Sequence, residues 1–361
     1  MVNIKQLWWR RYRGLIVLAL IASAAWMGLL ASGQISSYQN GIQAHGYASR
    51  WEWKFQHDDY LKHPKDYDEP IKGFKAWQLD TLRLYNNAQE SADYMGMSKK
   101  EASSYILPAN STGQTVNVVI IVAALLIGAF AAAWDHLSQF DRFIFGLGVK
   151  RQKYYWWRTG GLIGLATLAT VICFGGYWAW LFAKIPSEFV NLSGSMALAI
   201  FGYNWLLTVM GILLGQLIGL VIANPVAVGV TSVVSMILGY LGVQNLSSLA
   251  VNFHWIKSSF QLDMPLGGYW AIVIGAAVLT IWALLSGNWV YQQLSLDYPG
   301  WLRLHKALIP TTVVAVILIA SGVMFFTEHG YWDNHTLMVQ FVIAVIAGGV
   351  AFWHHRRMTT A

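Results

Sequence analysis

The sequence predicts an all-α, polytopic integral membrane protein with about eight transmembrane helices and a partly helical extracellular insert between the first two. Three observations lead to this fold class. Of the 361 residues, 56% are hydrophobic and 11% are charged, against about 25% charged residues in a typical soluble domain. Eight apolar stretches are long enough to cross a hydrocarbon core about 30 Å thick, which takes roughly 20 helical residues. The 19 tryptophans are typical of a chain with two membrane interfaces.

The N-terminal residues 1–13 combine aromatic and basic side chains, as cytoplasmic amphipathic segments at a membrane interface do. The interfacial residues are Trp8, Trp9, Arg10, Arg11 and Arg13. The apolar run 14–32 that follows has about 19 residues and exceeds the roughly 7–15 residues of a signal-peptide core. We therefore expect it to be retained as the first transmembrane helix.

The eight predicted transmembrane helices contain no Lys, Arg, Asp or Glu in their interiors, and prolines fall only at their ends or in loops. We expect mostly continuous helices, because a proline inside a helix removes a backbone hydrogen bond. The predicted bounds are 14–32, 115–134, 159–182, 195–221, 226–243, 268–286, 308–326 and 336–353.

Residues 33–114 form the only connection long enough to fold into a small domain. They contain ten acidic and nine basic residues together with many aromatic side chains. Residues 76–94 are expected to be helical, since Trp77, Leu82 and Tyr85 give this stretch a partly apolar face. A domain of this size buries a limited core, so we expect it to rest as a cap on the membrane part.

Lysine and arginine are concentrated on one side of the predicted bundle. With the N-terminus in the cytoplasm, 13 of the 24 basic residues lie in cytoplasmic segments and two lie in short outer loops; the other nine lie in the long loop, which this rule does not cover. We therefore expect a multi-pass cell-membrane protein with both termini in the cytoplasm and residues 33–114 outside. The expected cytoplasmic segments are 1–13, 135–158, 287–307 and 354–361.

Several function classes are disfavoured by what the sequence lacks. It contains no G-x-x-x-x-G-K-[ST] phosphate loop, no H-E-x-x-H and no G-x-S-x-G, so we expect no catalytic site and no cofactor on this chain. The predicted spans hold no ionisable residue, which disfavours an ion-coupled carrier. A partner must then supply the energy for any uphill transport. The net charge of +7 lies in clusters beside apolar runs, which indicates a lipid bilayer rather than nucleic acid as partner.

No metal site is expected. Asp135, His136 and Asp141 are the best candidates, but we expect them to solvate a helix end, because a metal site needs three or more ligands with supporting geometry. The run 354–357, with two histidines and two arginines, is interpreted as an interfacial anchor. Cys173 is the only cysteine and is expected to be a buried apolar residue.

Residues 135–158 mix aromatic and apolar side chains with five basic residues, so they are expected to lie along the membrane surface as short amphipathic helices. Two interpretations stay open. The stretch is either a simple interfacial connector or a docking surface for a cytoplasmic subunit, with aromatic and arginine side chains as anchors.

Gly211, Gly215 and Gly219 recur every four residues in the predicted helix 195–221, and this spacing allows another helix to approach closely. We expect the neighbouring helix to belong to the same chain; a helix of a second chain is the alternative. Gln216 on this helix needs a polar partner in the bundle or lines a path through it.

The run Leu147-Gly148-Val149-Lys150-Arg151, followed by Arg158, resembles the cytoplasmic signature of permease subunits of ABC-2-type ABC transporters. In that family a Leu-Pro-Val-Ser-Arg-like run lies between helices 2 and 3, and a basic residue opens helix 3. Here glycine stands at position 148 in place of the proline. The helix layout and the basic loop before the seventh helix are similar to the Gram-positive eight-helix branch of this family.

The resemblance implies a separate cytoplasmic ABC ATPase subunit, carrying ATP and Mg²⁺, that docks on this loop as on a coupling helix. The docking residues that it implies are Leu147, Gly148, Val149, Lys150, Arg151, Tyr154, Tyr155 and Arg158. It also implies a second permease chain, identical or related, and export of an apolar or amphipathic substrate. The chain itself would then be a membrane-spanning permease subunit and no enzyme.

The alternative is a non-transporting membrane sensor or immunity module that acts through the extracellular residues 33–114. Co-purification of a P-loop ATPase would favour transport. The absence of a stimulated ATPase activity across many candidate substrates would favour the sensor.

Overall fold

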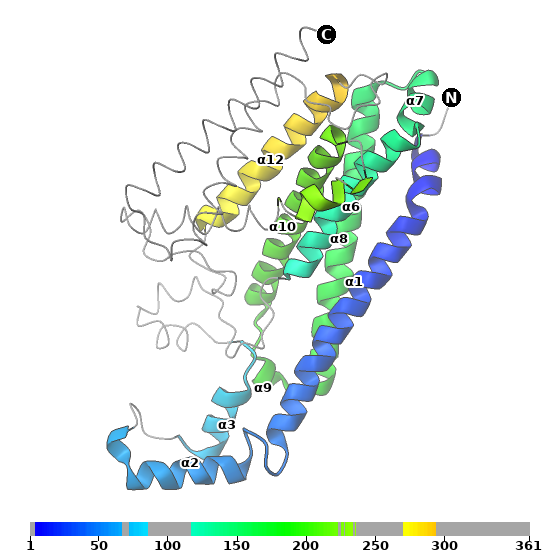
Figure 1. The fold of residues 1–361 in the computed structure, drawn as a ribbon. Helices are drawn as coiled ribbons and strands as arrows, with labels where there is room; N and C mark the ends of the chain where they lie inside the picture. The colour runs from blue at the N-terminus through cyan, green and yellow to red at the C-terminus, as the bar shows by residue number, and fades with distance from the viewer. Residues whose placement is uncertain are drawn as a thin grey trace, which may run out of the picture.

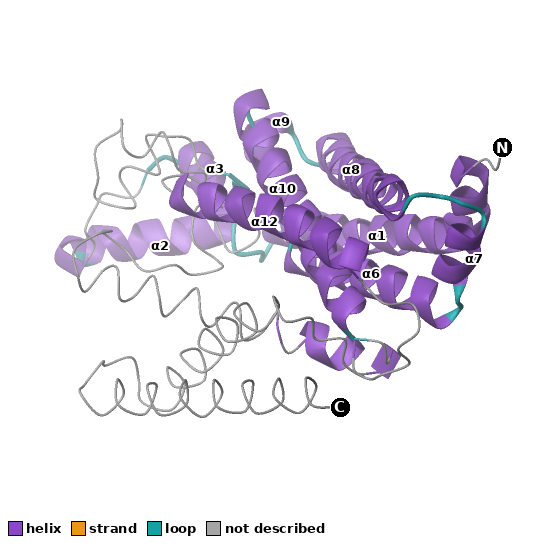
Figure 2. Cartoon of the chain, turned by 90° about the horizontal axis from the view of Figure 1, so that it is seen from above, coloured by secondary structure: helices purple, strands orange, loops and turns teal. Residues whose placement is uncertain are grey.

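The computed structural model describes residues 4–66, 72–85, 117–222, 225–226, 228–233, 235 and 270–293. Within these residues the chain is all-helical with short connecting loops (Figure 1 and Figure 2). The helices are α1 (Ile4–Ile42), α2 (Arg50–Lys62), the 3₁₀ turn η1 (Pro64–Asp66), α3 (Phe74–Leu82), α6 (Val118–Leu137), α7 (Phe140–Gly146), α8 (Arg151–Lys184), α9 (Ser187–Val190), α10 (Gly194–Val221) and α12 (Trp270–Gln293). Figure 1 places α7 at one end, called the α7 end, and α2, α3 and α9 at the other, called the α2 end.

Within the part of the chain that the structure describes, five helices are long and apolar enough to cross a membrane, which supports a multi-pass membrane protein. They are Gln6–Ile42, Val118–Leu137, Arg151–Lys184, Gly194–Val221 and Val273–Gln292. Each overlaps one of the eight predicted spans. The predicted spans 308–326 and 336–353 and the tail 354–361 lie outside the described residues, and 226–243 is described only in part.

Helix α1 is longer than the predicted first span. Its 39 residues extend about 58 Å at 1.5 Å per residue, nearly twice the thickness of a hydrocarbon core of about 30 Å. One helix runs through the predicted span 14–32 and beyond both of its ends. Hydropathy marks where a helix leaves the lipid, and no proline or other breaker ends the helix at that point.

Helix α8 begins at Arg151, eight residues before the predicted start at 159. Its 34 residues extend about 51 Å. The predicted cytoplasmic loop 135–158 therefore contains the last turn of α6, all of α7 and the first two turns of α8. The predicted span covers only part of α8, because aromatic and basic residues lower the hydropathy of a helix without ending it.

Helices α2 and α3 belong to the predicted insert. The side chain of Ser49 caps α2 by accepting a hydrogen bond from a backbone N–H of its first turn at 3.2 Å. Helix α3 ends at Leu82, so the predicted helix 76–94 stops early, and its residues after 85 lie outside the described part. The backbone N–H of Leu84 instead donates to the carbonyl oxygen of Phe189 at 2.9 Å, which joins this segment to α9.

Glycines allow the backbones of α6 and α10 to touch. On α10, an added Cβ at Gly211, Gly215 or Gly219 would press against or overlap the backbone of α6. On α6, a Cβ at Gly128 would overlap the carbonyl group of Ile212. The neighbour of the predicted glycine ridge is therefore a helix of the same chain.

Two buried polar side chains join α10 to other helices. Gln216 accepts a hydrogen bond from the hydroxyl of Thr159 on α8 at 3.1 Å. Asn204 accepts one from the backbone N–H of Asn117, at the start of α6, at 2.9 Å. These bonds fix α6, α8 and α10 relative to one another at two levels of the bundle.

Candidate functional site

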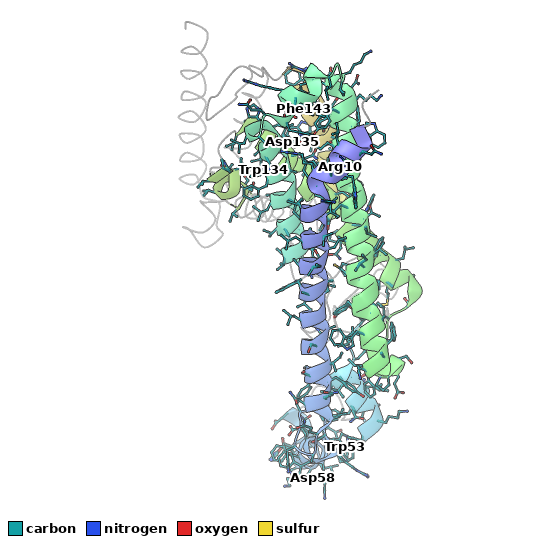
Figure 3. The ribbon with its side chains drawn as sticks, turned by 90° about the vertical axis from the view of Figure 1, so that its right-hand side faces the viewer. Arg10, Trp53, Asp58, Trp134, Asp135 and Phe143 are labelled. Atoms are coloured by element: carbon teal, nitrogen blue, oxygen red, sulfur yellow. The ribbon has the colours of Figure 1, made fainter. Side chains whose placement is uncertain are left out.

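Charged and hydroxyl-bearing side chains gather inside the bundle at the α7 end, around Asp135 (Figure 3). Asp135 lies in the last turn of α6 and is fully buried. Its Oδ1 accepts a hydrogen bond from Nε of Arg11 on α1 at 2.8 Å, and its Oδ2 accepts one from the hydroxyl of Tyr154 on α8 at 2.7 Å. Nη1 of Arg158, also on α8, lies 3.6 Å from Oδ2. Three helices therefore meet at one carboxylate.

The position of Asp135 explains why two arginines surround it. A helix C-terminus carries partial negative charge, so a carboxylate there is unfavourable, and burial removes the water that would screen it. Arg11 compensates for both, because it also donates to the carbonyl oxygen of Trp134 at 3.2 Å and to the hydroxyl of Ser138. Its guanidinium lies 4.4 Å from the ring centroid of Phe140. Arg11 thus neutralises the carboxylate and caps the end of α6.

Arg158 is fully buried, and none of its three guanidinium nitrogens makes a hydrogen bond to a described residue. It is held by attraction to Asp135 and by the ring of Tyr291 on α12, whose centroid lies 4.9 Å from Cζ. A guanidinium carries five N–H donors, and leaving them unpaired inside a protein is unfavourable. Of the charged groups in this site, the guanidinium of Arg158 therefore has the fewest hydrogen-bond partners among the described residues.

A second carboxylate, Asp141 on α7, is also buried and accepts a hydrogen bond from the hydroxyl of Tyr291 at 2.8 Å. Tyr291 contacts Asp141 with its hydroxyl and Arg158 with its ring. We call the group of interacting residues the ionic cluster: Arg11, Asp135, Asp141, Tyr154, Arg158 and Tyr291. Its two arginines and two aspartates balance in formal charge, and it joins α1, α6, α7, α8 and α12.

The ionic cluster corrects the expectation that Asp135 and Asp141 solvate a helix end. Both carboxylates are buried and paired instead. The described residues contain no group of three or more His, Cys, Asp or Glu side chains able to hold a metal ion. Hydropathy misses Asp135 and Arg158 because each lies one residue beyond a predicted apolar span, and both nevertheless pack inside the bundle.

Tyr291 is the residue of the cluster that sequence reasoning did not single out. The predicted span 268–286 ended before it, whereas α12 continues to Gln293. The available signal was a tyrosine placed one turn beyond an apolar run, on a helix with no charged residue of its own.

Three of the eight docking residues implied by the resemblance are buried, namely Tyr154, Tyr155 and Arg158. They share the face of α8 that points to α6 and α12, where the hydroxyl of Tyr155 donates to a backbone carbonyl of α12 at 2.8 Å. Arg151 is half-buried and donates to another carbonyl at the end of α12 at 3.1 Å. Of the implied docking residues, these four are therefore engaged within the chain.

The region formed by α7 and the start of α8 has an exposed outer face, which we call the docking surface. It comprises exposed basic and large apolar residues of α7, of the turn after it and of the first turns of α8: Arg142, Phe143, Leu147, Lys150, Lys153, Trp156 and Trp157. Phe143 is 54% exposed and Trp156 is 41% exposed. Aromatic rings interleaved with cations are suited to membrane headgroups or to a partner protein.

Gly148 forms the turn between α7 and α8 with φ of 76°. This is the left-handed region, which glycine adopts without steric cost, whereas the ring of proline fixes φ near −65°. The glycine that departs from the family signature is therefore required by the backbone here. A proline at position 148 would demand a different turn, so the local geometry is this chain's own.

The predicted interfacial N-terminal residues lie in the first turns of α1. The exposed ones are Trp9, Arg10 and Arg13. Arg11 points into the ionic cluster, and the indole of Trp8 packs so closely on Gly161 of α8 that an added Cβ there would contact the ring. The segment therefore exposes three of its predicted interfacial residues and packs Trp8 and Arg11 against the other helices. Comparison of the chain with models of protein families, with curated proteins and with solved structures gives no match.

Proposed function

We propose that this chain is the membrane-spanning permease subunit of an ATP-driven ABC exporter, and that a separate cytoplasmic ATPase subunit binds its docking surface. The observation that carries the proposal is the exposed aromatic and basic corner formed by α7 and the start of α8. The resemblance of Leu147–Arg151 to the coupling signature of ABC-2 permeases agrees with this placement. ATP and Mg²⁺ would be bound by the partner.

The way in which α7 and the start of α8 are connected to the other helices supports a coupling role. Helix α8 runs without a break from Arg151 to Lys184, so a displacement at the docking surface moves a helix long enough to cross the membrane. The ionic cluster ties α7 and α8 to α1, α6 and α12 through Asp135, Asp141 and their partners. A displacement of α7 and the start of α8 therefore also acts on α1, α6 and α12.

In the proposed orientation the α7 end and both termini face the cytoplasm, and residues 33–114 face outward. The excess of Lys and Arg in the segments assigned to the cytoplasm supports this orientation. A second permease chain, identical or related, completes the pathway. The proposed substrate class is apolar or amphipathic, as in the family that the sequence resembles.

The proposal is tested by purifying the tagged chain from its native membrane and identifying co-purifying proteins with a G-x-x-x-x-G-K-[ST] motif. We expect such an ATPase, and about tenfold less of it with the double variant Lys150→Glu and Lys153→Glu, since charge reversal repels a complementary acidic partner. Lys184→Glu, an exposed lysine at the opposite end of α8, is the matched control and leaves recovery unchanged. Arg151 is avoided because it bonds within the chain.

Absence of any such ATPase, or equal recovery with the double variant, would contradict the proposal. It would favour the second candidate function, a membrane sensor or immunity module acting through residues 33–114. One observation supports that candidate: residues of α1, of α3 and of the segment after α3 line a cavity at the α2 end.

A further inference from the structure

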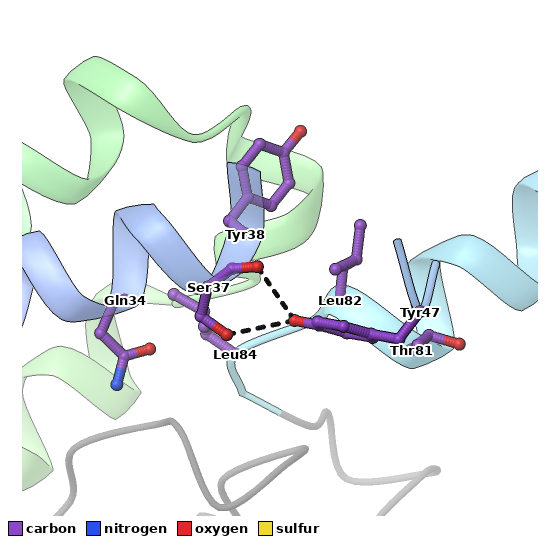
Figure 4. A pocket seen from close by; sticks show the side chains of 7 residues that line it. All are labelled: Gln34, Ser37, Tyr38, Tyr47, Thr81, Leu82 and Leu84. Atoms are coloured by element: carbon purple, nitrogen blue, oxygen red, sulfur yellow. Dashed lines mark hydrogen bonds between the residues drawn. The ribbon is translucent and has the colours of Figure 1, made fainter. Parts of the chain in front are cut away.

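The cavity at the α2 end lies between the last turns of α1 and the end of α3 (Figure 4). The described residues that line it are Gln34, Ser37, Tyr38, Tyr47, Thr81, Leu82 and Leu84. Its volume is about 300 Å³, at the lower bound of cavities that hold small molecules. It is separated from the ionic cluster by most of the length of α1 and takes no part in the coupling proposed above.

Gln34 provides the observation that points to a ligand. Its side chain lines the cavity and is 8% exposed, and its Oε1 has no hydrogen-bond partner among the described residues. A buried amide oxygen without a donor is unfavourable by the desolvation of that group. The oxygen is therefore satisfied when a molecule in the cavity donates a hydrogen bond to it.

The hydroxyl groups of Ser37, Tyr47 and Thr81 in the wall are engaged within the chain. The hydroxyl of Tyr47 lies 3.2 Å from the hydroxyl of Ser37 and donates to the carbonyl oxygen of the same residue at 3.2 Å. The hydroxyl of Thr81 donates to a carbonyl oxygen of its own helix at 2.9 Å. Oε1 of Gln34 is thus a buried acceptor of the described wall that has no donor.

The rest of the wall fixes the chemistry of the occupant. The seven described lining residues carry no formal charge, and Tyr38, Leu82 and Leu84 present apolar or aromatic surface. A charged ligand would lose its hydration without gaining a counter-ion, whereas an apolar chain would be buried favourably. The cavity therefore suits a neutral molecule with a donor at one end and an apolar body.

The frame of the cavity is fixed before any ligand binds. Leu82 and Leu84 are both 4% exposed, and Leu84 is held by its backbone bond to Phe189. Leu82 and Tyr47 both approach Gly41 so closely that a Cβ there would contact them. A wall held in this way loses little conformational freedom on binding, which favours affinity.

We propose that this cavity binds a neutral amphiphile whose hydroxyl or amide group donates to Oε1 of Gln34 and whose apolar body packs on Leu82 and Leu84. A molecule with a single short chain fits the volume, and a two-chain lipid does not. The inference does not rest on the exporter proposal, since binding is measured on the purified chain alone.

The experiment uses the full chain in phosphatidylcholine nanodiscs, without detergent, and monooctanoylglycerol with a photoactivatable diazirine in its acyl chain. After irradiation, mass spectrometry maps the labelled residues. We expect labelling within 34–47 and 81–84, displaced by unlabelled monooctanoylglycerol. Octanoate carrying the same diazirine is the charged probe, and we expect at least about fivefold less labelling from it, because its carboxylate is not compensated in this cavity.

Gln34→Leu removes the acceptor and keeps a side chain of similar size, so we expect about tenfold weaker labelling. Gln43→Leu, an exposed glutamine just beyond α1, is the matched control and leaves labelling unchanged. Thermal unfolding of both variants checks folding. If Gln34→Leu does not fold, Gln34→Glu, which retains an acceptor oxygen, is measured at a pH low enough to protonate it and is expected to label like the wild type.

Labelling outside the cavity, equal labelling by octanoate, or unchanged labelling of folded Gln34→Leu would each overturn the inference. So would loss of labelling in folded, protonated Gln34→Glu. These outcomes are independent of whether an ATPase co-purifies with the chain.

Discussion

Arg158 and Asp135 are both fully buried, and their nearest charged atoms, Nη1 and Oδ2, lie 3.6 Å apart between α8 and α6. This separation is longer than a hydrogen bond, so charge rather than donor–acceptor geometry holds the pair together. Removing one partner of a buried ion pair leaves the other charge uncompensated. The contact is therefore the point at which a small chemical change has a large effect on stability.

Asp135→Asn keeps the shape of the side chain and removes the charge that compensates Arg11 and Arg158. We expect the free energy of unfolding to fall by about 3–5 kcal/mol, the usual effect of breaking a buried pair on one side. Thermal unfolding of the purified protein in nanodiscs measures the change. The double variant Asp135→Asn with Arg158→Met is expected to recover part of the loss, because it removes the more deeply buried of the two uncompensated cations.

The control for this pair is Lys75→Ala. Lys75 and Glu188 lie 3.5 Å apart with exposed fractions of 77% and 50%. An exposed pair of this kind contributes about 0–1 kcal/mol, so little change is expected. Equal unfolding of Asp135→Asn and Lys75→Ala would show that the buried pair does not stabilise the bundle.

Tyr291 acts through two groups, and two substitutions separate them. Tyr291→Phe removes the hydrogen bond to the carboxylate of Asp141 and keeps the ring beside Arg158, so we expect a loss of about 1.5–3 kcal/mol. Tyr291→Leu also removes the ring, and the further loss is expected to be about 0.5–2 kcal/mol. Unfolding midpoints should therefore fall in the order wild type, Phe, Leu. If Tyr291→Phe were as stable as the wild type, the hydrogen bond to Asp141 would not contribute to stability.

The close approach of α6 and α10 predicts opposite effects for two glycines on one helix. Gly215→Ala places a Cβ against the backbone of Leu125 and is expected to destabilise by about 1–3 kcal/mol. Gly202→Ala meets no atom within 4 Å, and the better helix propensity of alanine is expected to stabilise by about 0.5–1 kcal/mol. Melting temperatures of the two variants provide the test. A shift of the same sign in both would contradict the packing.

The turn between α7 and α8 predicts a similar contrast. Gly148→Ala forces a side chain into the left-handed region at φ of 76° and is expected to destabilise by about 1–2 kcal/mol. Gly146→Ala, in the last turn of α7 with open space around it, is expected to be neutral or slightly stabilising. Denaturant unfolding of the two variants distinguishes them, and equal stability would argue against a left-handed turn at 148.

The membrane class of the protein was predictable, because a helix that crosses lipid needs an uninterrupted apolar run and such runs are visible in one sequence. The positions of the helix ends were less predictable from the sequence. Residues 33–42 are polar enough to end a hydropathy window, yet they continue α1, because no proline interrupts the helix there.

The ionic cluster was not predictable for a different reason. Arg11 and Asp135 are 124 positions apart, and their pairing depends on how α1 packs against α6. Tyr154 and Arg158 share a helix face, which the sequence does indicate, but that face is equally compatible with an interface outside the chain. The direction in which an aromatic and basic face points is decided by the remaining helices.

Helix α1 carries Arg11 near one end and Gln34 near the other, 23 positions apart and thus separated by about 35 Å of unbroken helix. A rod of this length pivots as a unit: a rotation of a few degrees about its middle shifts both side chains in opposite directions. The ionic cluster and the cavity are therefore attached to the same rigid helix, so that a tilt of α1 which displaces one also displaces the other.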